Sequence, residues 1–400
     1  MSMRIGTATL AQQGITTILD QQSRIARIQQ QISSGHKDAS AADNPADFAA
    51  AIGFDQALAQ LDRFGKNGDV VANRLGLEDN ALSQVNDTLQ RIRELAIEAN
   101  NGTQDNVSRQ STIAELKSRL QQLVDVANSD DGQGRFLFAG TNDGAPPFSF
   151  AANVVNYAGN ANTRRIDVGP GTSVADGDDG QSVFLNVTTG NGTFAARAAS
   201  TNTGTVLLKS AAVVDSTQWD AGTYAINFTS PTTYEVRDSG NLLVTSGTYA
   251  AGQAVTFRGV SVTLEGNAMT GDSFSVAPGS TSDVFSIVQN LIDTLNVPQG
   301  SVAGEAARHN AMYGAIEDID RALDHIVNTR ASVGARVNEV KDAQSSQESL
   351  SLQLTQSLSD VRDTNFTQAV SQLQLQLTAL QAAQQSFVKI QGLSLFDYLR

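Results

Sequence analysis

The 400-residue sequence contains no cysteine, three histidines and one tryptophan. Without cysteine there can be neither a disulfide framework nor a thiolate metal site. With so few histidines, a Ser–His–Asp arrangement has few candidates. The 27 Lys and Arg are outnumbered by 41 Asp and Glu, which gives a net charge of −14. A nucleic-acid partner is therefore not expected, because phosphate binding needs clustered cations.

Long apolar runs are also missing. None approaches the ~18 apolar residues that a membrane span needs, so we expect no membrane insertion. Gln, Gly and Thr interrupt the apolar residues of the first segment, which excludes a typical cleaved signal peptide. The first and last 40 residues each contain more Lys and Arg than Asp and Glu, so the negative charge lies in the middle. This charge pattern, with nearly neutral ends and an acidic middle, indicates that the ends are buried in an assembly.

Candidate metal-binding residues are few. His309 and His325 lie too far apart on one expected helix to share a metal, which favours surface or packing roles. The segment Asp176-Gly177-Asp178-Asp179-Gly180 resembles part of a calcium loop, but Val187 stands where such a loop requires a bidentate Glu. We therefore predict no catalytic, cofactor-binding or metal-binding residue, no cofactor and no enzymatic activity.

Proline and glycine divide the chain into three parts. Of the seven prolines, only Pro45 lies outside the stretch from Pro146 to Pro298, and about half of the 33 glycines lie in 142–284. This distribution predicts a multidomain α plus β protein, with a helical bundle or coiled-coil rod from both chain ends and an inserted all-β domain at its tip. The expected boundaries are 1–33 and 360–400 for terminal assembly helices, 34–141 and 285–359 for the helical rod, and 142–284 for the β domain.

Apolar residues spaced three and four apart predict three rod helices that pack on one another. Asn100-Asn101-Gly102 should end the first of them. The third keeps coiled-coil-like heptads with one polar intruder, Arg330. The stripes are Leu82, Val85, Leu89, Ile92, Ala96 and Ala99; Ile113, Leu116, Leu120, Leu123 and Ala127; and Ile316, Ile319, Leu323, Ile326, Val333, Val337 and Val340.

The middle predicts short strands that are separated by Gly, Asp and Asn turns, as in a sandwich or barrel-like module. The expected strands are 223–228, 232–237, 254–257, 260–264 and 273–277. Trp219 could be an exposed binding aromatic. A core role is favoured, because its neighbours Tyr224 and Phe228 alternate as in a strand.

Both chain ends carry amphipathic stripes on faces that are otherwise rich in Gln, Ser and Thr. Such faces carry little charge repulsion, which suits helices that are buried among copies of themselves. The apolar area is too small to order these ends alone, so we expect them to be mobile in the free monomer and helical on assembly. The predicted assembly interface consists of Ile18, Ile25, Ile28, Ile32, Phe366, Val370, Leu373, Leu377, Leu380, Phe387 and Leu393.

Several stretches carry family signatures. Ile32-Ser33-Ser34-Gly35 and Ala41-Ala42-Asp43-Asn44-Pro45-Ala46, with turn residues Gly35, Asp43, Asn44 and Pro45, resemble the N-terminal signature of the flagellin-like family of flagellins and hook-associated proteins. Asp360-Val361-Arg362-Asp363-Thr364-Asn365-Phe366 is similar to the segment that begins the family's C-terminal helix. The ending Leu393-Ser394-Leu395-Phe396-Asp397-Tyr398-Leu399 resembles hook-associated members more than flagellins.

The resemblance implies a structural subunit of the bacterial flagellum that polymerises into a ring-like layer between hook and filament. It also implies contacts with a neighbouring hook-associated protein and with flagellin, and an export chaperone that holds the C-terminal helix. The location would be extracellular, after export through the flagellar type III apparatus without a cleaved signal. Two alternatives remain open: a flagellin, whose ending would normally differ, and an enzyme on a helical stalk, which would need a titratable constellation.

Overall fold

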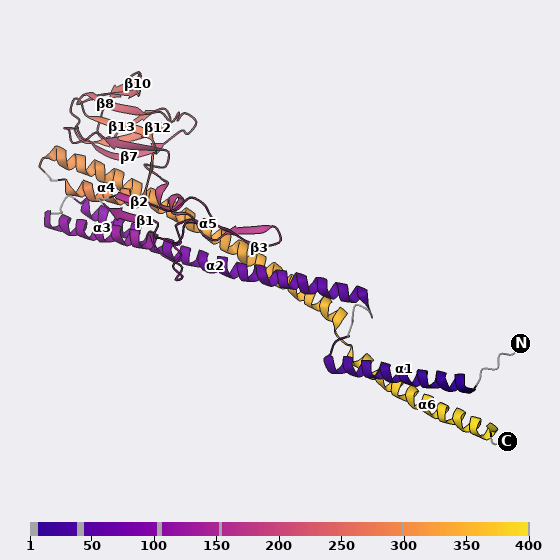
Figure 1. Cartoon of the computed structure of the whole chain (residues 1–400). Coiled ribbons are helices and arrows are strands. Elements are labelled where there is room, and N and C mark those ends of the chain that lie inside the picture. The colour runs from indigo at the N-terminus through magenta and orange to yellow at the C-terminus, as the bar shows by residue number, and fades with distance from the viewer. Residues whose placement is uncertain (1–6, 38–43, 102–105, 152–153, 298–299, 399–400) are drawn as a thin grey trace. The chain divides into compact units, whose positions relative to one another are not determined.

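The computed structural model describes residues 7–37, 44–101, 106–151, 154–297 and 300–398. Its helices are α1 (Thr7–Ser34), α2 (Pro45–Ala99), α3 (Asn106–Ala127), α4 (Val284–Asn296), α5 (Val302–Arg362) and α6 (Phe366–Tyr398) (Figure 1). The chain forms two compact units, residues 1–66 with 344–400 and residues 67–343. Among the described residues, no helix is long and apolar enough to cross a membrane.

In the second unit, α2 to α5 share one hydrophobic core. All six residues of the predicted α2 stripe, from Leu82 to Ala99, are fully buried. Helix α2 ends at Ala99, directly before the predicted stop. On α5, Ile319, Ile326, Val333 and Val340 are fully buried. The polar residue in this row, Arg330, lies at the edge of the core, where its Nε donates to Asp79 on α2 at 2.9 Å. The predicted packing of the three rod helices is confirmed.

Short strands and a turn of π-helix also join this helical core. They are β1 (Phe148–Ala151), β2 (Val154–Tyr157), β3 (Arg165–Gly169), β4 (Thr172–Ala175), η1 (Gln181–Leu185), β5 (Val187–Thr188) and β14 (Thr281–Ser282). Phe148 packs edge-on against Phe184, with ring centroids 5.4 Å apart. Phe285 of α4 is tilted against Phe148 at 5.4 Å and stacks on Phe184 at 5.7 Å. The strands before residue 190 therefore pack with the helices.

The remaining strands form a two-layer β domain around a separate core. One sheet has the order β10-β9-β8-β13-β6 and the other β11-β12-β7. Their bounds are β6 (Phe194–Ala198), β7 (Leu207–Val213), β8 (Tyr224–Ser230), β9 (Thr233–Asp238), β10 (Leu243–Thr248), β11 (Ala254–Phe257), β12 (Val260–Glu265) and β13 (Ser273–Pro278). The five strands expected from the sequence correspond to β8, β9, β11, β12 and β13. Trp219 packs partly buried against Phe194 and Tyr224, which confirms its core role.

Polar contacts attach the β domain to the first turns of α5. The side chain of Asn310 accepts from the backbone N–H of Leu208 at 2.7 Å and donates to the carbonyl of Val206 at 2.7 Å. Arg197 on β6 donates to Glu317 at 3.0 Å and to Asp318 at 2.7 Å. These contacts fix β7 beside α5 (Figure 1). The predicted fold class, a helical rod from both chain ends with an inserted β domain, is confirmed.

In the first unit, α1 and α6 lie side by side (Figure 1). None of their described residues belongs to either of the two hydrophobic cores. Only Ile25, at 7% exposure, and Ala369, at 5%, are buried among their described side chains. The terminal helices therefore form a pair that depends little on the rest of the chain.

Candidate assembly surface

The terminal helices pair in antiparallel fashion, as contacts at three levels establish. The turn after α1 bridges the turn before α6, where the N–H of Lys37 donates to the carbonyl of Arg362 at 2.7 Å. Further along, the side-chain amide of Gln21 donates to that of Gln376 at 2.7 Å. Near the other end of the pair, the ring of Phe387 lies against Gly14.

The turn-signature residues lie at the end of α1 and at the start of α2, and their residue types suit these positions. Gly35 ends α1 with φ = +76°, a backbone conformation that side chains other than glycine rarely adopt. Pro45 occupies the first position of α2, where its missing N–H costs nothing. Asn44 precedes it and caps the helix, because its side-chain oxygen accepts from the N–H of Asp47 at 3.3 Å. Asp43 lies outside the described residues.

The residues predicted for the interface fall into two groups. Seven of them belong to a seam in which α1 and α6 face each other, and they are buried or half-buried at steps of three and four residues. We define the seam as Gly14, Ile18, Gln21, Ile25, Ile28 and Ile32 of α1 with Ala369, Leu373, Gln376, Leu380, Ala383 and Phe387 of α6. The structure thus brings these predicted residues together within one chain.

The other described interface residues remain uncovered on α6. Phe366 is 54% exposed, Val370 44% and Leu377 41%. Val388, which the sequence reasoning missed, is 68% exposed and lies eleven residues after Leu377, close to three helical turns. These four residues share one face of the helix and are called the α6 stripe below. The side chain of Leu393 lies outside the described residues.

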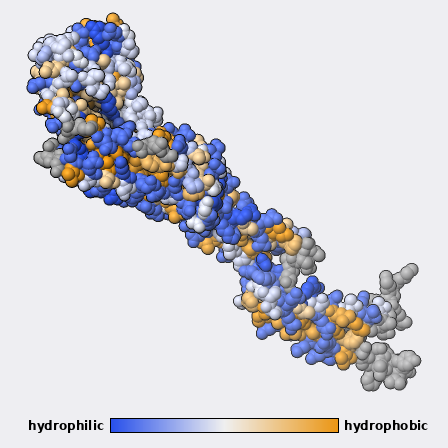
Figure 2. All heavy atoms as spheres, turned by 60° about the vertical axis from the view of Figure 1, so that its left-hand side comes forward, coloured by the Kyte–Doolittle hydropathy of each residue, from blue (hydrophilic) through white to orange (hydrophobic). Residues whose placement is uncertain are grey.

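Two further uncovered residues were missed on α1. Ile15 is 44% exposed and Leu19 is 58% exposed, one turn apart. Their four-residue spacing was the available signal, but the more regular isoleucines of the seam obscured it. Figure 2 shows apolar surface gathered over the terminal pair. An isolated exposed leucine is ordinary, whereas a continuous stripe on a helix marks a contact surface.

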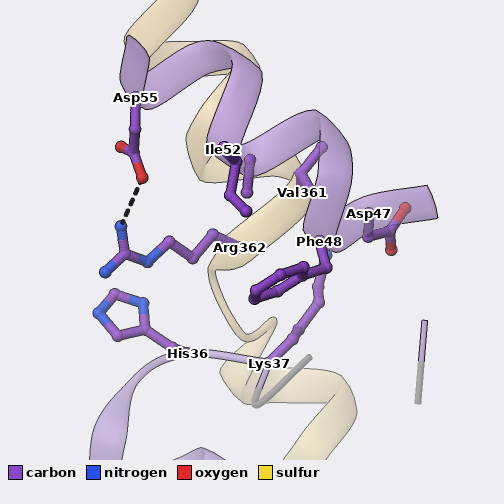
Figure 3. A pocket seen from close by; sticks show the side chains of 9 residues that line it. His36, Lys37, Asp47, Phe48, Ile52, Asp55, Val361 and Arg362 are labelled. Atoms are coloured by element: carbon purple, nitrogen blue, oxygen red, sulfur yellow. Dashed lines mark ion pairs between the residues drawn. The ribbon is translucent and has the colours of Figure 1, made fainter. Parts of the chain in front are cut away.

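A groove of about 350 Å³ opens beside the turn signature. Phe48 and Ile52 of α2 and Val361 of α5 supply apolar walls, and Figure 3 shows charged side chains at its rim. Arg362 there pairs with Asp55 at 3.9 Å. His36, the one histidine of the groove, pairs with Asp363 at 3.1 Å. These paired charges present no nucleophile with an adjacent base.

A second cluster of charges is buried in the second unit, beneath the loop that was considered as a calcium site. Arg74 of α2 is 7% exposed and lies between Asp131 at 3.4 Å and Asp176 at 3.6 Å. Asp178 pairs with Arg336 of α5 at 2.5 Å. Arginine side chains thus pair with Asp176 and Asp178, and Asp179 accepts from the N–H of Ser182 at 2.9 Å. Among the described residues, no group of three or more His, Asp or Glu could hold a metal ion.

Glu78 of α2 lies at the centre of this cluster and was not identified from the sequence. It is 1% exposed, and its Oε1 accepts from the N–H of Asp178 at 3.0 Å. Burial raises the pKa of Glu78 to about 8, and the neighbouring carboxylate of Asp178 adds to the rise. Arg336 opposes this shift without cancelling it. The cluster joins α2, α5 and the loop into one structural unit.

Comparison with known proteins agrees with this architecture. Residues 5–143 match the bacterial flagellin N-terminal helical region, and residues 197–278 match the D2-like domain of flagellar hook-associated protein 1. The flagellar hook-associated protein 3 of Escherichia coli is 24% identical over 399 residues, 99% of each chain. A flagellin of Salmonella montevideo is 26% identical over 268 residues, or 56% of this chain.

Two solved structures are more closely similar. The FlgL of Xanthomonas campestris is 39% identical with a TM-score of 0.72, over 76% of this chain and 99% of its own. The flagellar junction protein FlgL of Legionella pneumophila is 28% identical with a TM-score of 0.71, over 78% of this chain and all of its own. A helical rod built from both chain ends, with an inserted β domain, defines a flagellin-like structural protein of the bacterial flagellum. Within that class, the chain belongs to the family of flagellar hook-associated protein 3, the FlgL proteins.

We expect the stability of the second unit to fall as pH rises. Below about pH 4.5 Glu78 is protonated in both the folded and the unfolded chain. Between about 4.5 and about 8 the unfolded chain loses this proton first, so unfolding becomes more favourable, and above about 8 the effect levels off. Urea unfolding near pH 5 and near pH 9 measures the difference.

The variant Glu78→Gln provides the control, because an amide mimics the protonated carboxyl at every pH. It should lose most of the difference in unfolding free energy between the two pH values. An equal pH dependence in wild type and variant would show that Glu78 is not the group responsible.

Proposed function

We propose that this chain is the subunit of the layer that joins the flagellar hook to the filament. Its terminal helices are the parts that polymerise, and the protein has no catalytic role. The α6 stripe is the observation that carries this proposal. It leaves Phe366, Val370, Leu377 and Val388 between 41% and 68% exposed on a helix pair that already uses its seam residues internally.

Burial of this stripe favours association over a free monomer. Full burial of one such side chain is worth about 1.5–3 kcal/mol, so four partly exposed residues supply several kcal/mol per contact. The surrounding Gln, Ser and Thr side chains add no net charge that would repel a second copy. A stripe on one face, met by a different face of the next subunit, gives a heterologous contact, which closes into a ring or continues as a helix.

The same stripe supports the proposed partners. A neighbouring hook-associated protein and flagellin would meet it in the finished structure, and an export chaperone would cover it beforehand. The proposed route is export without a cleaved signal to an extracellular position in the flagellum. Long helices that contribute little to the cores unfold at low cost, which suits passage as an extended chain.

We expect Leu377→Asp to abolish assembly while the chain still folds. A charge at this position would have to be buried in the subunit contact, at a cost that corresponds to about tenfold or more in affinity. In the free chain Leu377 is exposed, so the free energy of unfolding should change by less than about 0.5 kcal/mol. Filament number and swimming of a null strain that carries the variant measure assembly, and urea unfolding of the purified variant measures folding.

Ala382→Asp is the matched control. Ala382 is exposed on α6 outside both the seam and the stripe, so it receives the same charge on the same helix. It should support filaments at the wild-type level. If both variants assembled normally, the stripe would not be a subunit contact.

Loss of the whole chain separates the junction role from the filament role. A strain without it should build complete hooks without filaments and release flagellin into the medium, because the filament subunit would still be made and exported. If the chain were itself the filament subunit, such a strain would release no flagellin. Electron microscopy of hooks and immunoblotting of the medium for flagellin provide the readout.

A further inference from the structure

The seam between α1 and α6 contains one polar pair in an otherwise apolar or small-residue row. Gln21 Nε2 donates to Gln376 Oε1 at 2.7 Å, and both side chains are half-buried. On α1 the neighbouring seam residues are Ile18 and Ile25, and on α6 they are Leu373 and Leu380. A slip of either helix by one turn would therefore place each amide against an isoleucine or a leucine, and a slip by one heptad would separate the two amides. A polar residue at such a position selects register at a cost in stability.

A second contact in the seam selects the same alignment. A Cβ atom on Gly14 would lie 2.8 and 3.2 Å from two ring carbons of Phe387, so the ring fits closely only against a glycine. The next residue of the row on α1 is Ile18, whose β-branched side chain would meet the ring after a slip by one turn. The glutamine pair and the glycine–phenylalanine pair are seven residues apart on α1 and eleven apart on α6, and both contacts form in the single alignment that the structure has.

Register matters because it determines the surface that the pair presents. Ile15, Leu19, Val370, Leu377 and Val388 each follow a seam residue directly, so each is rotated from the seam by the same ~100°. In two antiparallel helices, equal rotation from a shared seam leads to the same side of the pair. All five residues therefore lie on one side, and the register decides which apolar residues of α1 stand beside which of α6.

We propose that Gln21 and Gln376 act as the register-determining pair of the terminal helices and thereby shape the apolar surface that the next copy of this chain recognises. This inference rests on the proposed function, since it names residues that give specificity to that assembly. An all-aliphatic seam would bind more strongly but in several alignments, and only one of them would present the composite surface. The glutamine pair weakens the pairing of α1 with α6 but restricts it to a single alignment.

The double variant Gln21→Leu with Gln376→Leu tests this inference. Spin labels at Ser33→Cys and Ser386→Cys report the alignment, because the chain has no cysteine of its own and a slip by one turn moves one label by ~5 Å along the pair. In assembled material the chain with both glutamines should give one narrow distance. The leucine variant should give a shifted or broadened distribution, and complementation of filament formation should fall by about tenfold.

Two further variants keep the result interpretable. Gln13→Leu with Gln368→Leu makes the same chemical change at exposed positions of the same helices and should leave distance and assembly unchanged. Gln21→Glu with Gln376→Lys restores a polar pair and should restore the narrow distance and most of the assembly. Failure of this rescue would contradict the register role, as would a leucine variant with the wild-type distance and full assembly. If the unmodified chain itself failed to restore filaments to the null strain, the proposed function would be wrong instead.

Discussion

The structure of this protein depends on apolar surface that the chain does not cover by itself. A helix pair buries side chains on the faces that touch, and here those faces are the seam between α1 and α6. The α6 stripe lies outside the seam, with Leu377 41% and Val388 68% exposed. Because water is a poor environment for such a stripe, we propose that a neighbouring molecule covers it in the assembled state. The absence of charge along most of α6 permits the same face to be repeated in many copies.

The rest of the molecule is arranged so that this dependence is confined to the ends. The second unit has two cores of its own, and polar contacts of the buried Asn310 and the half-buried Arg197 fix the β domain to α5. The cluster around Glu78 ties the loops to α2 and α5. The second unit is stable by itself, whereas the terminal helices leave apolar surface uncovered. This arrangement suits a subunit that folds first and assembles afterwards.

Much of the fold could be predicted from the sequence, because its signals are local. The stripe from Leu82 to Ala99 and the heptads around Ile319 follow helical spacing closely, and both are buried where the spacing placed them. Strands such as β8 and β12 were predicted from β-branched and aromatic residues between turn residues. Strands β1 to β5 were not predicted, because they are short and pack with helices, and β6, β7 and β10 were not predicted either. Glu78 could not be found, since Asp178, which causes part of its shift, lies a hundred residues away in the sequence.

The apolar residues of the candidate surface could be predicted from the sequence. Which of them lie in the seam and which lie in the exposed stripe could not. Spacing identified Ile25, Leu373 and Leu377 alike as apolar positions on terminal helices. It could not tell which of them the partner helix covers, because that depends on the register between two segments more than 300 residues apart. The sequence around Gln21 and Gly14 did not indicate a role for either residue. Their roles follow from their contacts with Gln376 and Phe387 on α6.

Hydrogen–deuterium exchange of the terminal helices, in the free chain and in assembled flagella, tests the central claim most directly. The account predicts rapid exchange of residues 7–34 and 366–398 in the free chain, because the pair buries few side chains, and strong protection after assembly. The amides from Leu82 to Ala99 should be protected in both states and serve as the internal reference. Strong protection of both terminal helices in the free monomer would contradict the account.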